Sequence, residues 1–221
     1  MGISNVGLKG MCPGVIIAGF CVISYLIMVL FPALRGMLIL SPSLQSILIA
    51  PWKILTYQFV HIGALHLMVN VIGLLWMSRQ LSGAISASSF IILFIGGSVC
   101  GALTFLVTCG FSGDYSASLA GASAGVFALV AATACLGRKK WVVIFFLPLV
   151  LLYGSASAHA GGLIFGFFAV CRGLIADLRV VRKISERRFR LLSKVRMSGY
   201  AALSDDEKRD LERLTERRTV E

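Results

Sequence analysis

Long apolar runs, separated by short stretches of charged or turn-forming residues, make up most of this chain. A helix that crosses the hydrocarbon of a bilayer needs about 20 mostly apolar residues. Six runs are candidates, several of them shorter than this, at Gly14 to Leu34, Val60 to Met77, Ile85 to Cys109, Gly121 to Leu136, Trp141 to Tyr153 and His159 to Ile175. The pattern predicts an all-α membrane protein, a bundle of six transmembrane helices.

The overall composition agrees with a membrane location. The chain is 57% hydrophobic and 14% charged, whereas a soluble domain has about 25% charged residues. The six cysteines show no C-x-x-C spacing and most lie within or at the ends of apolar runs. We therefore expect neither disulfides nor a zinc site, and the sequence indicates no other metal or cofactor. The first run is too long for a signal peptide and is expected to remain as the first span.

The basic residues divide the chain into two parts. Of the 21 lysines and arginines that give the net charge of +11, 14 lie from Arg172 onward. The basicity therefore belongs to a tail and gives no reason to expect a nucleic-acid partner. We expect a membrane domain over residues 1–176 and a basic cytoplasmic tail over residues 177–221.

The tail itself contains two different patterns. Arg179 to Arg196 interleaves basic with apolar residues, as in a segment lying on an anionic inner leaflet. A solvated tail with partial helicity fits the same pattern. Ser204 to Glu207 forms a capping box, which predicts a short helix containing Leu211 and Leu214.

The positions of the charged loops predict the orientation. With six spans, Lys9, Arg79, the Arg138 to Lys140 cluster and the tail fall on one side, and Arg35 and Lys53 fall on the other. The positive-inside rule then places both termini in the cytoplasm. The loop from Arg35 to Phe59 lies outside, and its apolar residues suggest that it is partly sunk in the outer leaflet, with Trp52 at headgroup level.

Polar side chains at membrane depth are costly, so each is a candidate for function. The candidates are His61, His66, Asn70, Ser123 and His159, with the hydroxyls of Thr104, Thr108 and Thr133. His66 and Asn70 are four residues apart and share one helix face. His61, five residues before His66, is expected to face elsewhere, at the helix entrance, and its role stays open. Ser123 and His159 each begin a span at the outer side, at a depth similar to that of His66 and Asn70.

This convergence favours nucleophilic catalysis. A serine hydroxyl needs a base, and His159 is the candidate for Ser123. Asp114 lies in an outer loop and Asp177 at the inner end of the sixth span, so neither carboxylate is expected to reach His159. The prediction is a Ser-His dyad whose imidazole packs against the ring of Phe127. Donors for an oxyanion are the Ser123 backbone N–H, the His66 ring and the Asn70 amide.

Small residues surround the proposed nucleophile. Gly121-x-Ser123-x-Gly125 matches the nucleophile elbow of soluble hydrolases in spacing, but the strand that the elbow requires is missing. Taken alone, such small-residue spacing more often packs two helices. Gly162-x-x-x-Gly166 follows His159, and we expect this stripe to meet Gly121, Ala124 and Ala128.

Together these motifs resemble the rhomboid family of intramembrane serine proteases. The resemblance covers roughly Pro51 to Phe167 and rests on four motifs in the family's order: Trp52-Lys53, His61-x-x-x-x-His66-x-x-x-Asn70, Gly121-Ala122-Ser123-Ala124 and Ala158-His159-x-x-Gly162-x-x-x-Gly166. It implies Ser123 as nucleophile, His159 as base and His66 with Asn70 as oxyanion donors. It also implies a bundle with a water-accessible cavity that opens outward, in a bilayer such as a bacterial inner membrane, and transmembrane proteins as substrates.

The chain departs from the family pattern at three positions. Lys53 stands where many members have Arg, Ala124 where many have Gly, and Phe127 where some have Tyr. None of these departures removes a catalytic group, although a lysine cannot form a bidentate fork.

The same sequence features argue against other types of intramembrane protease and against a transporter. The sequence has no H-E-x-x-H motif and no pair of membrane aspartates, which excludes the zinc and aspartyl types of intramembrane protease. A catalytically silent rhomboid-like protein that binds membrane helices is the alternative, although such proteins usually lack the serine or the histidine. A transporter with a histidine proton relay would need acidic partners within the spans. The physiological substrate and the oligomeric state stay open.

Overall fold

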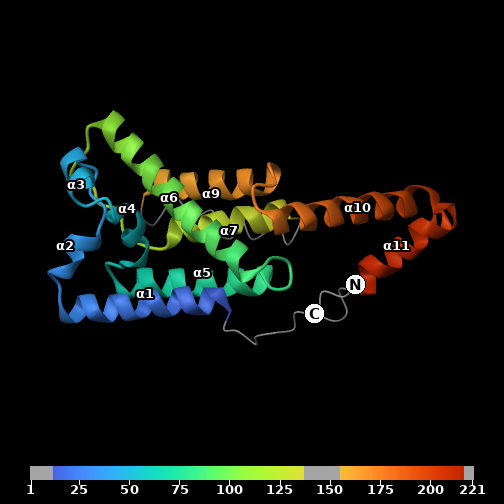
Figure 1. Ribbon diagram of the computed structural model, residues 1–221, viewed down its shortest axis with the longest axis horizontal. Coiled ribbons are helices and arrows are strands. Elements are labelled where there is room, and N and C mark those ends of the chain that lie inside the picture. The colour runs from blue at the N-terminus through green and yellow to red at the C-terminus, as the bar shows by residue number, and fades with distance from the viewer. Residues whose placement is uncertain (1–11, 137–154, 217–221) are drawn as a thin grey trace.

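The computed structural model describes residues 12–136 and 155–216, and these residues are arranged in helices (Figure 1). Lys9, the Arg138 to Lys140 cluster and the fifth predicted span, Trp141 to Tyr153, lie outside the described residues. An isolated β-bridge joins Leu40 and Leu119. The all-α class is thus confirmed for the described part of the chain. Its elements are α1 (Pro13–Leu30), α2 (Leu34–Leu38), α3 (Leu44–Ile49), α4 (Lys53–Thr56), η1 (Tyr57–Phe59), α5 (Ala64–Leu81), α6 (Ala87–Ser112), α7 (Ser123–Cys135), α9 (Ala156–Cys171), α10 (Ala176–Ser198), η2 (Tyr200–Ala202) and α11 (Asp205–Glu216).

Within residues 12–136 and 155–216, two helices, α1 and α6, are long and apolar enough to cross a membrane. A third span results if α4 with η1 and α5, which meet at a bend of 94°, count as one. The helices α7 and α9 are apolar but shorter, with 13 and 16 residues. On α1 the side chains of Phe20, Ile23 and Leu30 are more than half exposed, as suits contact with lipid. The protein is therefore a membrane protein, and the count of six spans stays a prediction.

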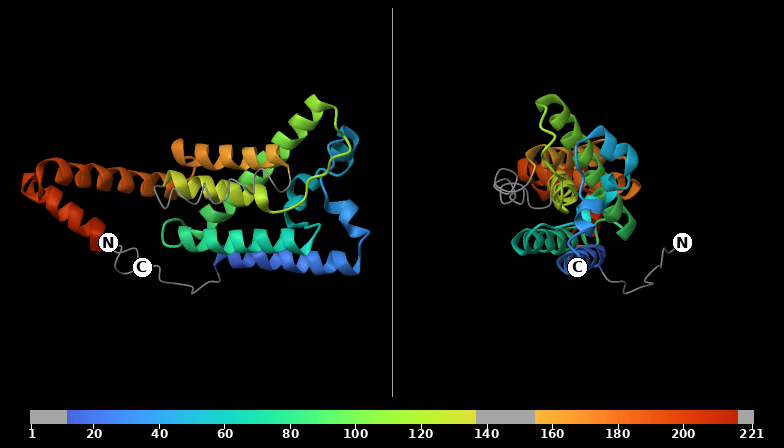
Figure 2. Two further views of the ribbon diagram at one scale, coloured as in Figure 1. Left: turned by 180° about the vertical axis from the view of Figure 1, so that it is seen from behind. Right: turned by 90° about the vertical axis from the view of Figure 1, so that its left-hand side faces the viewer.

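The centre of the bundle is α7. Every residue from Ala124 to Thr133 is buried, which is the expected environment for a helix that is apolar on all sides. In the views of Figures 1 and 2, α6 and α9 pack beside α7 on one side. On the other side α5 separates α7 from α1. Ser123 is the first residue of this central helix.

The predicted second span begins later than expected. The chain from Val60 to Gly63 forms a non-helical turn, and α5 begins only at Ala64. In contrast, α9 begins at Ala156, three residues before His159, where the Ser155 hydroxyl accepts a hydrogen bond from the Ala158 N–H. His159 therefore lies in the first turn of its helix.

Glycines set the spacing between the central helices. A Cβ atom on Gly162 or Gly166 of α9 would collide with the backbone of Ala124 or Ala128 on α7. A Cβ atom on Gly101 of α6 would lie 2.5 Å from the Cβ atom of Ala124 on α7 and 2.8 Å from the Ala158 carbonyl oxygen on α9. The backbones of α6, α7 and α9 can approach this closely only because these positions lack side chains.

The tail folds into a helical hairpin. In Figure 1, α10 continues away from the bundle along its long axis, and α11 folds back. The hairpin has a small apolar core of Leu191, Val195, Leu203, Leu211 and Leu214. Leu191 and Val195 therefore pack against the chain's own residues, because the returning helix α11 covers this face of α10. Phe189 and Leu192 of the same segment stay exposed, so its position on the inner leaflet stays a prediction.

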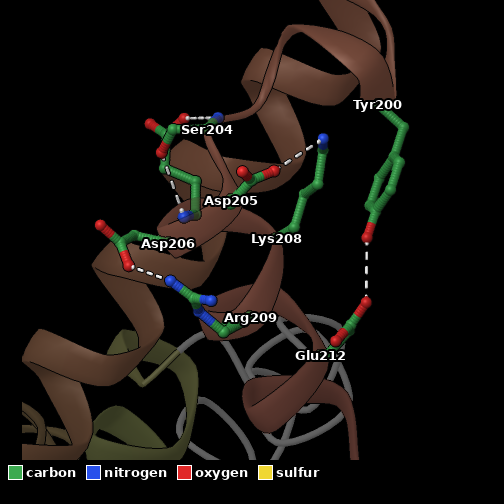
Figure 3. Close-up of polar contacts among 8 residues, drawn as sticks. Tyr200, Ser204, Asp205, Asp206, Lys208, Arg209 and Glu212 are labelled. Atoms are coloured by element: carbon green, nitrogen blue, oxygen red, sulfur yellow. Dashed lines mark hydrogen bonds and ion pairs between the residues drawn. The ribbon is translucent and has the colours of Figure 1, made fainter.

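Polar contacts fasten the same hairpin. The predicted capping box forms, because the Ser204 N–H donates to the Glu207 carboxylate at 2.9 Å and the Glu207 N–H donates to the Ser204 hydroxyl at 3.3 Å. The Tyr200 hydroxyl donates to Glu212 at 3.1 Å (Figure 3). Lys194 of α10 pairs with Glu207 at 2.7 Å. The division of the chain into residues 1–176 and 177–221 stays a prediction.

Candidate active site

The side chains of Ser123 and His159 meet between α7 and α9. The Oγ atom of Ser123 lies 2.8 Å from Nε2 of His159, within hydrogen-bond distance. Ser123 is partly exposed, whereas His159 is 2% exposed. A buried imidazole in contact with an accessible hydroxyl is the arrangement that general-base activation of a serine requires.

The ring of Phe127 packs against the imidazole of His159. Their centroids are 4.6 Å apart and their planes are tilted by 43°. Phe127 lies one helical turn beyond Ser123 on α7, so the same helix carries the nucleophile and the packing surface for its base. This contact restricts the rotation of the imidazole.

Gly121 contacts a different helix from the one that the sequence suggested. We expected it to join the stripe of Gly162 and Gly166, but a Cβ atom at position 121 would lie 2.6 Å from Cε1 and 2.7 Å from Nε2 of His66, on α5. The prediction failed because Gly121 precedes α7 and has a φ of +114°, so it does not continue the face of the helix. Gly121 instead allows the His66 ring to approach the start of α7.

His61 lies before the start of α5, at the helix entrance as expected, but the prediction that it faces away from His66 was wrong. Its side chain is fully buried, and its ring lies 5.1 Å from that of His66 in an edge-on contact. Its Nε2 accepts a long hydrogen bond of 3.5 Å from the backbone N–H of Ala122. The helical spacing behind the prediction does not apply, because His61 lies in the turn before α5.

Backbone hydrogen bonds hold the segment before Ser123 against the chain between α1 and α5. Leu119 and Leu40 exchange two N–H to C=O bonds, at 2.8 and 3.1 Å. The Gly121 N–H donates to the Tyr57 carbonyl at 3.0 Å. Tyr57 is itself fully buried, and its hydroxyl donates to the Ser98 carbonyl on α6 at 2.7 Å. The nucleophile therefore follows a segment that is fixed at several points.

Asn70 lies on the same side of α5 as His66. It is buried, and its side-chain amide donates to the His66 carbonyl at 2.9 Å. A primary amide has two N–H donors, so this bond uses one of them. Ser123 is the first residue of α7, and the N–H groups of a first helical turn have no acceptor within the helix. The His66 ring and the Asn70 amide on α5 and the backbone N–H groups at the start of α7 are thus three kinds of hydrogen-bond donor near this end of α7.

The carboxylate of Asp114 is not a partner of Ser123 or His159 in the described part of the chain. That side chain lies in an exposed turn after α6 and accepts hydrogen bonds from the Ser116 hydroxyl at 2.7 Å and the Ser116 N–H at 3.0 Å. These bonds hold the pKa of the Asp114 carboxyl below its ordinary value. Asp177 is the second residue of α10, beyond the end of α9.

Helix α6 contributes to the site through small residues that the sequence did not reveal as part of it. Besides Gly101, a Cβ atom on Gly97 would collide with Ala128 of α7, and one on Gly161 of α9 would collide with the Thr104 hydroxyl. In the sequence, Gly96, Gly97 and Gly161 are further small residues within apolar runs. They indicate close packing, but they do not reveal which helices meet.

Comparisons with known proteins agree with the geometry. The Rhomboid domain family matches residues 50–174. Rhomboid-related protein 3 of Homo sapiens is 33% identical over 99 residues, which cover 45% of this chain and 22% of that protein. Rhomboid protease GluP of Bacillus subtilis (strain 168) is 28% identical over 130 residues, which cover 53% of this chain and 25% of that protein. Each match thus spans about a quarter of the relative's own length. Because the family match covers more than half of the chain and includes Ser123 and His159, this protein belongs to the rhomboid family.

Proposed function

We propose that this protein is an intramembrane serine protease that cleaves single-span membrane proteins near the outer face of the membrane. The observation that carries the proposal is the 2.8 Å separation between Ser123 Oγ and His159 Nε2. Membership of the rhomboid family and the name of the Bacillus relative, a rhomboid protease, support it.

In the proposed reaction the Ser123 hydroxyl donates its proton to His159 Nε2 while Oγ attacks the scissile carbonyl carbon. The tetrahedral intermediate collapses when His159 returns the proton to the leaving amine, and an acyl-enzyme remains. Water, deprotonated by the same imidazole, then attacks the ester carbonyl carbon, and His159 returns this proton to Ser123 Oγ as the acyl group leaves. Phe127 contributes by keeping the imidazole in the orientation that both proton transfers need.

The oxyanion of each intermediate needs hydrogen-bond donors at the start of α7. We assign this role to the Ser123 N–H, a ring N–H of His66 and the Asn70 amide. The contact between His66 and Gly121, two residues before the nucleophile, supports this assignment. Loss of one such donor costs about 10²-fold to 10³-fold in kcat in other serine proteases.

The length of α7 supports access of water to the dyad. Its 13 residues span about 20 Å, whereas the hydrocarbon core is about 30 Å thick. If the inner end of α7 reaches the cytoplasmic surface, Ser123 lies below the outer surface. Non-helical backbone at such a depth is stable only when it is buried in protein or lines a water-filled cavity. We include in the proposal six spans, both termini in the cytoplasm and a cavity that opens outward.

The test is cleavage of a generic single-span substrate by the purified full chain in detergent. We expect Ser123→Ala, His159→Ala and the double variant to lose cleavage to the same extent, because residues that act as one unit are not additive in their loss. A double variant clearly slower than either single variant would contradict the dyad. A wild-type chain that binds the substrate without cleaving it would support the alternative, a silent membrane-helix binding protein.

A further inference from the structure

Thr104 of α6 connects two helices of the site with a hydrogen bond. Its hydroxyl Oγ1 lies 2.8 Å from the carbonyl oxygen of Ser157 on α9. The carbonyl oxygens of Cys100 and Gly101 on its own helix are also within reach, at 3.1 and 3.0 Å. A hydroxyl has one proton, which these three acceptors share, and the shortest distance is the one to α9. Ser157 is two residues before His159, in the first turn of α9.

Near Thr104, apart from the ring of Phe127 on His159, the first turns of α9 meet α6 and α7 through small residues, whereas Phe165, two turns further along, packs over Gly96 of α6. Gly162 and Gly166 face α7, while Gly161 and the carbonyl oxygen of Ala158 face α6. Contacts between glycine and alanine allow a close approach, but van der Waals contact has no directional preference. Such contacts fix the distance between helix axes better than they fix axial sliding or rotation of one helix on the other. A hydrogen bond is directional and resists both movements.

Thr104 lies at a close approach of α6 and α9. A Cβ atom on Gly161 would collide with the Thr104 hydroxyl and would lie 2.7 Å from the Cys100 carbonyl oxygen. A Cβ atom on Gly101 would lie 2.8 Å from the Ala158 carbonyl oxygen. The hydroxyl therefore acts on α9 at the level of its first turn, where a small rotation displaces the His159 side chain directly.

From these contacts we infer that Thr104 is a positioning residue, which sets the register of α9 on α6 and thereby the distance between His159 and Ser123. This inference rests on the proposed function. Thr104 acts through the backbone of Ser157 and contacts neither member of the dyad in this role. Because a displacement of about 1 Å in a catalytic group can cost about 10²-fold in rate, one interhelical hydrogen bond is sufficient to affect turnover.

The chain offers a matched control one turn further along α6. Thr108 is exposed, and its hydroxyl donates to the Thr104 carbonyl at 2.8 Å, within its own helix. Thr108→Val therefore removes the same hydroxyl from the same helix without removing a bond to α9. Thr104→Ser keeps a hydroxyl at the interhelical position and serves as the conservative variant.

The experiment measures kcat and KM of the full chain in detergent for a single-span substrate, together with the rate at which a fluorophosphonate labels Ser123. We expect Thr104→Val to lower kcat about tenfold or more while KM changes by less than about twofold, since substrate binding does not depend on the dyad distance. The labelling rate is expected to fall in proportion to kcat. Thr104→Ser and Thr108→Val are expected to keep near wild-type kcat.

Wild-type kcat and labelling in Thr104→Val would overturn the inference, as would a raised KM with unchanged kcat. Failure of Thr104→Ser to restore turnover would overturn it too, because the hydroxyl would then not be the important group. If Thr104→Val does not fold, Thr104→Ala is compared with Thr104→Ser by the same measurements. Failure of the wild-type chain to cleave or to be labelled contradicts the proposed function instead, so the two failures are distinguishable.

Discussion

The imidazole of His66 lies so close to Gly121 that a Cβ atom at position 121 would be 2.6 Å from ring atom Cε1. The backbone of Gly121 has a φ of +114°, a conformation that side chains rarely permit. Both constraints require glycine at this position. The start of α7 and the side chain of His66 can therefore approach each other only because residue 121 has no side chain.

Gly121→Ala is expected to reduce cleavage about 10²-fold, since it displaces either His66 or the segment before Ser123. The measurement is the initial rate of cleavage of a single-span substrate. Gly113→Ala is the control for backbone strain, because Gly113 has a φ of +70° but no atom near its Cβ position. A Gly121→Ala variant no slower than Gly113→Ala would show that the contact with His66 is unimportant.

Gly162→Val is expected to impair both packing and turnover. Its side chain would collide with the backbone of Ala124, so α9 would move away from α7 and His159 away from Ser123. We expect a lower thermal unfolding temperature and a loss of cleavage, measured on the same preparation. Gly19→Val in α1 is the control, because nothing lies within 4 Å of a Cβ atom there. Unchanged turnover in Gly162→Val would mean that this glycine does not set the distance within the dyad.

His66→Ala and Asn70→Ala are expected to retain measurable cleavage, about 10²-fold below the wild-type rate, because other oxyanion donors remain. The two variants differ in one further effect. Asn70→Ala also removes the bond to the His66 carbonyl, and therefore weakens α5 near His66. Wild-type rates in both variants would exclude an oxyanion role for these residues.

Both members of the candidate dyad could be predicted from the sequence, because polar residues at membrane depth are few. Ser123 and His159 stood out in apolar runs, and their positions at the outer ends of two spans suggested that they meet. The partner of Gly121 and the position of His61 could not be derived in this way. Both residues lie in non-helical segments, where helical spacing does not tell which way a side chain points. The interhelical bond of Thr104 was equally hidden, since a threonine in a membrane helix usually bonds to its own backbone.

The hairpin of α10 and α11 is expected to loosen at low pH. The Glu207 carboxylate accepts hydrogen bonds from Lys194 at 2.7 Å and from the Ser204 N–H at 2.9 Å, and these partners lower its pKa in the folded hairpin. A carboxyl whose folded pKa is lowered stabilises the fold above its unfolded pKa of about 4.3. This stabilisation is lost as the pH falls through the lower, folded value.

Hydrogen exchange of the α11 amides, corrected for the intrinsic effect of pH, measures this change. Protection is expected to decrease as the pH falls below about 4 in the wild-type chain. Glu207→Gln is expected to show lower protection at neutral pH and less dependence on pH. Asp205→Asn is the control, because Asp205 pairs with Lys208 within α11 and not with α10. Equal pH dependence in the wild-type chain and Glu207→Gln would show that Glu207 does not fasten the hairpin.

The position of the dyad predicts where a substrate is cut. Ser123 and His159 lie in the first turns of α7 and α9, and one helical turn rises about 5.4 Å, so the proposed orientation places both near the outer face. A substrate helix hides its carbonyls in i to i+4 hydrogen bonds, so the scissile bond must first become extended. We expect preferred substrates to have glycine, proline or other poor helix formers at the outer end of their span, and a small residue before the scissile bond.

The test is a pair of substrates with the same helix-breaking residues at the outer or at the cytoplasmic end of the span, with cleavage sites identified by mass spectrometry. Only the first is expected to be cut, and efficient cleavage of the second near the inner leaflet would show that the proposed orientation is inverted.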